Sequence, residues 1–163
     1  MYARVIETRM DNNHAKNIHA WIEKAAEGLP QKELIVVFEL AVQAVWERSL
    51  IPLSEVTLVA IFERVLHNTQ KQFPLFADIR LESNGVVLKG LNGRAAELSI
   101  SELKKAFQFF LTELIFLLGV LTSDLLTSAY YSELSKVSVE YRKKNAGVLE
   151  SMSGQAEGKY QNE

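Results

Sequence analysis

The feature that most constrains the fold is an apolar segment at residues 106–121, which carries a single charged side chain, Glu113. A second apolar segment, at residues 34–46, is also interrupted only once, at Glu39. A helix that is apolar on every side cannot lie on the surface of a soluble protein. Each segment is therefore expected to form a central helix, to lie in a subunit interface or to enter a membrane.

Membrane insertion is the weaker of these interpretations. Lys104 and Lys105 precede the apolar segment, and its length approaches the roughly 20 residues that a membrane span requires. Glu113 lies in its middle, however, and a carboxylate at the bilayer centre costs about 3 kcal/mol. The sequence therefore favours a buried or interfacial helix, and we expect no membrane span.

Composition excludes several classes of function. The 163 residues include no cysteine, which rules out thiol catalysis, zinc sites with sulfur ligands, iron–sulfur clusters and disulfides. The 18 basic and 20 acidic side chains give a net charge of −2 without a basic run, so nucleic-acid binding has no support. The first residues lack the apolar core of a secretory signal, and we expect a cytoplasmic protein.

Helical periodicity and helix-ending residues predict a mainly α (α+β) fold, a bundle of about five helices. Gly28 and Pro30 end the first helix, Ser54 is the expected N-cap of the third, and Ser99 with Glu102 forms a capping box before the fourth. The expected helices are residues 13 to about 27, 32–50, 55–72, 100–118 or beyond, and 123–142.

One β-hairpin is expected within this bundle, at about residues 78–90. Apolar and charged residues alternate before Asn84–Gly85, and a second apolar run follows that dipeptide. Asn-Gly is the strongest short hairpin signal, because both turn positions adopt positive φ. A two-residue loop there sets Leu81 opposite Leu88.

The predicted organisation is a single helical domain with the hairpin, at residues 1–142, followed by a flexible polar tail at residues 143–163. The first twelve residues carry little pattern and are expected to form a short arm. The tail is expected to be frayed or disordered, because small and polar residues follow two lysines and an Asn-Ala-Gly run.

Glu39 and Glu113 are the most informative candidates for a binding site, since an unpaired carboxylate in an apolar helix is costly to ionise. If both face the core together, they form an acid pair or a polar anchor for a ligand, with Trp46 and Phe110 among the aromatic residues of its pocket. The simpler interpretation, which we favour, is that each carboxylate lies at the edge of its helix.

His67 is the candidate phosphoacceptor, because an exposed histidine on a bundle helix can accept a phosphoryl group. His19 and Glu23 lie one helical turn apart, but no second ligand pair accompanies them, so no metal site is predicted. No cofactor motif and no catalytic set is recognisable, and the sequence favours a non-catalytic protein over an enzyme.

Three hypotheses for function follow. The first is a non-catalytic regulatory or sensory helical module that acts through homodimerisation or partner-protein binding. A bundle of about five helices can enclose about one helix fully, whereas this chain has two apolar helices, and a second copy is the simplest cover for the surplus. The alternatives are a protein that binds a small apolar ligand between residues 34–46 and 106–121, and a histidine phosphotransfer-type signalling protein.

Overall fold

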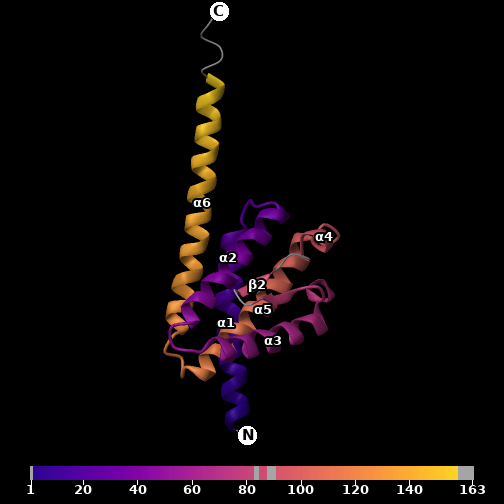
Figure 1. Ribbon diagram of the computed structural model, residues 1–163, viewed down its shortest axis with the longest axis vertical. Coiled ribbons are helices and arrows are strands. Elements are labelled where there is room, and N and C mark those ends of the chain that lie inside the picture. Colours follow the sequence, from indigo (N-terminus) through magenta and orange to yellow (C-terminus); the bar gives the residue numbers. More distant parts are fainter. Residues whose placement is uncertain (1, 83–84, 88–90, 158–163) are drawn as a thin grey trace, which may run out of the picture.

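Six α-helices make up most of the described chain in the computed structural model (Figure 1). The structure describes the backbone of residues 2–82, 85–87 and 91–157 and the side chains of residues 13–82, 91 and 93–147. In chain order the elements are α1 (Tyr2–Ala26), α2 (Gln31–Ser49), α3 (Glu55–Gln72), the 3₁₀ turn η1 (Pro74–Phe76), β1 (Arg80–Glu82), β2 (Gly85–Val87), α4 (Leu91–Ala95), α5 (Ile100–Leu121) and α6 (Thr127–Glu157).

The helix boundaries follow the local signals of the sequence. Gly28 follows α1 with a φ of +73°, a conformation that glycine adopts without steric cost. The Ser54 hydroxyl accepts a hydrogen bond from the Thr57 backbone, and Ser99 forms the predicted capping box with Glu102. The predicted N-caps of α3 and α5 are therefore confirmed.

The two apolar helices meet through aromatic rings in the core. The ring of Phe38, on α2, stacks on that of Phe107, on α5, with 4.0 Å between the centroids. Phe76 and Phe110 complete the cluster around Phe38, with centroid distances of 6.1 and 5.6 Å. Burying each such side chain contributes about 2–3 kcal/mol, which makes this contact the centre of the core.

Helix α6 covers α2 and α1 along one side of the bundle and extends beyond it (Figure 1). Ser49 hydrogen-bonds to Tyr130, and Asn145 donates to Glu33, so α6 runs antiparallel to α2. The Trp21 indole, on α1, donates to the Leu134 carbonyl over 2.8 Å. The chain thus covers much of its second apolar helix with its own last helix.

Both termini differ from the expected arm and tail. Helix α1 begins at Tyr2, and α6 continues through Glu157 instead of ending near residue 142. The first twelve residues, expected to form a short arm, are therefore helical from Tyr2, and the expected end of the last helix near residue 142 is wrong. These extensions were not predicted because both segments show only weak helical periodicity in the sequence. The division into a domain and a tail stays a prediction.

The chain turns sharply between α5 and α6. Ser123 and Asp124 adopt positive φ values of 51° and 60°, which are uncommon for residues with a side chain. The Asp124 amide donates to the Gly119 carbonyl over 2.8 Å, and a Cβ at Gly119 would lie 2.7 Å from an Asp124 carboxylate oxygen. A side chain at position 119 would therefore displace the Asp124 carboxylate, and α6 begins at Thr127, four residues later than predicted.

Strands β1 and β2 pair antiparallel, with Leu81 opposite Val86 and Glu82 opposite Gly85. The predicted pairing of Leu81 with Leu88 is wrong, because two residues, 83 and 84, separate the paired Glu82 and Gly85, and Gly85 belongs to β2. Residues 83–84 and 88–90 lie outside the described residues. The full hairpin over residues 78–90 stays a prediction.

A membrane span requires a helix that is both long and apolar. No helix in the described part of the chain combines the necessary length with the necessary apolar character.

Candidate interaction surface on helix α5

One side of α5 stays open to solvent along most of the helix. Its residues recur every three or four positions and so share one side of the helix. We call them the α5 stripe: Glu102, Lys105, Phe109, Glu113, Phe116 and Val120. Lys105 is exposed, Phe109, Glu113 and Phe116 are half-buried, and Val120 is 60% exposed. The rest of the helix, including Phe107, Phe110 and Leu114, is buried in the core.

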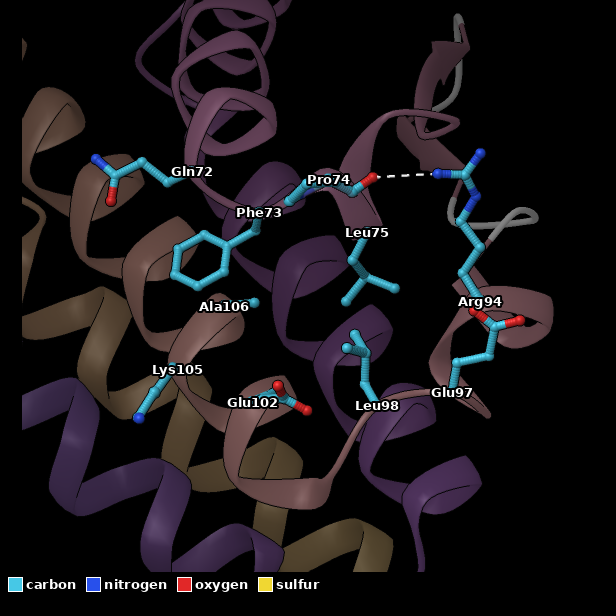
Figure 2. Close-up of a pocket in the computed structure, with 10 residues that line it drawn as sticks. All are labelled: Gln72, Phe73, Pro74, Leu75, Arg94, Glu97, Leu98, Glu102, Lys105 and Ala106. Carbon is cyan, nitrogen blue, oxygen red and sulfur yellow. Dashed lines mark hydrogen bonds between the residues drawn. The ribbon is translucent and has the colours of Figure 1, made fainter.

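A hollow of about 570 Å³ lies at the start of the stripe (Figure 2). Phe73, Leu75, Leu98 and Ala106 give it an apolar wall, and charged side chains form its rim. The surrounding loops are held by polar contacts: Arg94 pairs with Asp78 over 2.8 Å and donates to the Pro74 carbonyl, and Gln31 donates to the Leu98 carbonyl. The hollow is therefore a built feature of the α3–α5 junction.

A second hollow, of about 400 Å³, adjoins the first, since Phe73 and Lys105 line both. Ala15, Gln108, Phe109, Thr112 and Glu113 complete its lining. Thr112 is 7% exposed, and its hydroxyl has no hydrogen-bond partner among the described residues. The threonines Thr69 and Thr122, by contrast, each donate to the carbonyl one turn earlier. The two hollows make a continuous depression along the first half of the stripe.

Charges on the stripe differ in how they are held. The pKa of the Glu102 carboxyl lies below its ordinary value, because the Ser99 backbone amide and then the Ser99 hydroxyl donate to it. This capping box turns the Glu102 carboxylate back toward Ser99. Lys105 and Glu113 form no ion pair with any residue that the structure describes, while the charge of Lys105 also helps to lower the pKa of the Glu102 carboxyl. The stripe thus carries two anions and one cation.

The two predicted carboxylates do not meet. Glu113 lines the second hollow, beside residues of α1 and the end of α3, whereas the contact of α5 with α2 runs through Phe107 and Phe110. Glu39 is half-buried on α2, and burial raises the pKa of its carboxyl above the ordinary 4.5. Each carboxylate lies at the edge of its helix, as the simpler interpretation expects.

The other candidate residues lie apart from both hollows. Trp46 is 3% exposed and packs edge-on against Phe62, with 4.9 Å between the ring centroids. Phe110 is 1% exposed and contacts Phe38 and Phe76 in the core. His67 is exposed on α3. The Phe110 ring thus fills space between α2 and α5, the Trp46 ring packs against α3, and the hollows lie on another side of α5.

The sequence reasoning missed a group of exposed apolar side chains at the connections between helices. The Ser49–Tyr130 hydrogen bond of 2.9 Å brings the end of α2 close to the start of α6, and Figure 1 shows the α2–α3 and α5–α6 connections at the same end of the bundle. Ile51 is 75% exposed, Leu121 54% and Leu125 81%. Their position in loops and at a helix end hid them from a search based on helical periodicity.

The first helix offers no metal site in the described part of the chain. His19 hydrogen-bonds to Gln108, and Glu23 pairs with Lys104 over 3.2 Å. No group of three histidine, aspartate or glutamate residues with metal-binding geometry occurs among the residues described. His14 is 7% exposed and hydrogen-bonds to the Tyr131 hydroxyl, which joins α1 to α6.

Comparison with protein-family models, with curated proteins and with solved structures finds no match for this chain.

Proposed function

We propose that the protein is a non-catalytic regulatory or sensory helical module that acts by associating with another protein chain, first of all a second copy of itself. The observation that carries the proposal is the exposure of large apolar side chains beside a well-packed core. Val120, Leu121 and Leu125 are all more than half exposed at the end of α5 and in the turn that follows it. Several large apolar side chains exposed within six residues of the chain are a feature of protein interaction sites when they form a common surface.

The shape of α5 supports the same proposal. Its stripe combines half-buried aromatic rings with two adjoining hollows, and aromatic side chains beside pockets are the usual anchors of protein interfaces. Three of the six residues of the stripe are charged, and one of them, Glu113, lies between its two aromatic residues, so association there needs complementary charges on the partner. The architecture supports a regulatory role, because association would change the surroundings of a helix that also forms the core.

Sedimentation velocity of the full chain tests the proposal, over about 1–100 μM protein. We expect a species of twice 18.4 kDa that dissociates on dilution. The matched variants are Leu125→Ser, in the exposed turn, and Val139→Ser, an exposed apolar position on α6. If Leu125 lies in or beside the interface, its variant weakens association more than the α6 variant does. A single 18.4 kDa species at all concentrations would contradict self-association.

A small apolar ligand is the second candidate, and the hollow of Figure 2 favours it. Its volume of about 570 Å³ and its mixture of apolar walls with a few charged groups are in the range of small-molecule sites. This location differs from the predicted site between residues 34–46 and 106–121. Native mass spectrometry of freshly purified protein tests the candidate, since a bound ligand adds a discrete mass to the monomer. Exposure of His67 alone gives the phosphotransfer hypothesis no comparable support.

A further inference from the structure

The geometry points to a specific homodimer, in which α5 pairs antiparallel with α5 of a second copy and a two-fold axis passes through Phe109. This inference rests on the proposed function and names its interface. We take the occupant of the α5 stripe to be a second copy because two opposite charges of the stripe, Lys105 and Glu113, lie at equal distances on either side of Phe109. The third charge, Glu102, is held in the capping box with Ser99.

Lys105 lies four residues before Phe109, and Glu113 lies four residues after it. In an antiparallel pair centred on Phe109, Lys105 of each copy faces Glu113 of the other, so the ion pair forms twice. Two-fold interfaces have this reciprocal property by necessity. Within one chain the two residues are about 12 Å apart along the helix, too far for an ion pair. Neither residue is within ion-pair distance of an oppositely charged described residue, although, besides the hydrogen bonds from Ser99, the charge of Lys105 contributes to lowering the pKa of the Glu102 carboxyl.

The apolar residues obey the same symmetry. Val120 lies eleven residues after Phe109, and Leu98, in the first hollow, lies eleven residues before it. The antiparallel pair therefore brings the exposed Val120 of one copy to the hollow of the other. Phe116 is placed opposite Glu102, whose carboxylate the capping box turns toward Ser99. In the proposed pair, the Phe116 ring of the second copy can therefore occupy the hollow beside Ala106.

The surroundings of α5 are compatible with this approach. Helix α1 contacts α5 through Gln108 and Lys104, and the end of α3 contacts it through the rings of Phe73 and Phe109, which lie 5.7 Å apart. Lys105 and Val120, near the two ends of the stripe, are exposed, whereas Phe109, Glu113 and Phe116 between them are half-buried. The Phe116 ring lies edge-on to the His14 ring of α1, with 6.5 Å between the centroids, so a second copy would contact the remaining exposed part of this ring. The hollows lie along its first half, which is the half that the last turns of the second α5 would cover.

A charge-swap experiment tests the inference on the full chain. We expect Lys105→Glu and Glu113→Lys each to raise the dissociation constant of the dimer by about tenfold or more, because each places like charges opposite one another twice. The double variant K105E/E113K exchanges the charges of both pairs, and we expect its dissociation constant to return to within about threefold of the original. The measurement is sedimentation velocity, with circular dichroism to verify folding.

The matched control uses α3, where Glu63 and Lys71 are exposed and have the same spacing of eight residues. Glu63→Lys, Lys71→Glu and their double variant should leave the dissociation constant unchanged. If the unaltered protein dimerises but the α5 variants behave like the control, or the double variant fails to recover, this interface is wrong and the proposed association stands. If the unaltered protein is monomeric at about 100 μM, both fail.

A second measurement does not depend on charge. The chain has no cysteine, so Phe109→Cys introduces its only thiol, and on the two-fold axis that thiol faces its own copy. We expect mild oxidation to convert this variant to disulfide-linked dimers much faster than Val120→Cys, whose thiol faces Leu98 of the second copy. Equal rates of cross-linking, or faster cross-linking at position 120, would overturn the two-fold axis at Phe109.

Discussion

The buried hydrogen bond between Ser49 and Tyr130 should be a coupled pair that fastens α6 to α2. Both side chains are 0% exposed, and their hydroxyl oxygens lie 2.9 Å apart. The Ser49 hydroxyl donates its one proton to the Val45 carbonyl over 2.7 Å, so Tyr130 must donate to Ser49. The direction of this hydrogen bond determines whether a substitution leaves a buried donor without an acceptor.

The two single substitutions should therefore differ in cost. Tyr130→Phe removes a donor but leaves Ser49 bonded to Val45, and we expect a loss of about 1 kcal/mol in the free energy of unfolding. Ser49→Ala leaves the buried Tyr130 hydroxyl without an acceptor, at a cost of about 1–3 kcal/mol. The double variant has neither orphaned group, so its loss should fall short of the sum by about 1 kcal/mol or more.

Urea unfolding followed by circular dichroism measures these free energies, with every variant at one protein concentration because association adds to stability. Tyr130→Phe combined with Thr69→Val is the matched control, since Thr69 donates to the Val65 carbonyl and has no partner in common with Tyr130. That pair should be additive. Additivity within about 0.4 kcal/mol for Ser49 and Tyr130 would refute the assigned direction and importance of their bond.

The same tyrosine should make stability depend on alkaline pH. Burial raises the pKa of the Tyr130 hydroxyl above the ordinary 10.0, and the Ser49 hydrogen bond and the nearby Arg48 oppose this rise. Because the folded chain holds the proton more tightly, the stabilisation is complete below pH 10 and is lost as the pH rises beyond it. Burial also raises the pKa of the Tyr131 hydroxyl. Tyr130→Phe should reduce the slope of stability against pH above about 10, and an unchanged slope would contradict this reasoning.

Three further substitutions test local features by thermal or urea unfolding. Glu39→Gln should raise the free energy of unfolding at pH 7 by at most about 0.5 kcal/mol, because the carboxylate is only half-buried. This gain should vanish below pH 4.5, where the carboxyl is protonated in the folded and the unfolded chain. A loss of stability at pH 7 would instead show that Glu39 has a stabilising partner. Thr112→Val should be neutral or stabilise by up to about 1 kcal/mol, because it removes a buried hydroxyl without a hydrogen-bond partner among the described residues. Thr69→Val should destabilise by about 1 kcal/mol, because it removes the hydrogen bond to the Val65 carbonyl. Equal losses would mean that the Thr112 hydroxyl has a hydrogen-bond partner. Gly119→Ala should destabilise the protein by about 1–2 kcal/mol, because the added methyl group would lie too close to the Asp124 carboxylate. The double variant G119A/D124A should recover part of this loss. No recovery would exclude the contact with Asp124 as the cause.

The sequence was most informative where a local signal decides the structure. The helix starts at Ser54 and Ser99 and the end of α1 before Gly28 depend on hydrogen bonds or dihedral angles within one turn, and all were predictable. The start of α6 was not, since nothing in the sequence marks Ser123 and Asp124 as residues with positive φ. The register of the two strands was also predicted wrongly, with Leu81 opposite Leu88 instead of Val86. The Asn84–Gly85 dipeptide favours a turn but does not by itself determine which residues pair.

Tertiary packing decided what local signals could not. Residues 34–46 were expected to need a partner, and α6 supplies much of that cover through contacts such as the Ser49–Tyr130 hydrogen bond. Some apolar surface remains in both expected segments, at Val36 and Leu40 on α2 and at Val120 on α5, and more lies at the ends of helices, where it was not expected. An apolar helix gives little indication of which side a bundle will leave open, because its sequence has few polar residues to mark that side.

The α5 stripe also gives a physical reason why residues 106–121 are apolar on nearly every side. The core side must be apolar because Phe107, Phe110 and Leu114 are buried. On the open side, ring contacts with Phe73 and His14 cover Phe109 and Phe116 only in part, and Val120 is 60% exposed. In the proposed dimer those residues are covered by the second copy. Glu113, the one charge within the apolar segment, then lies opposite the Lys105 that precedes the same segment. A helix with two apolar faces and one charge is therefore what an element needs when it serves both the core and a two-fold interface.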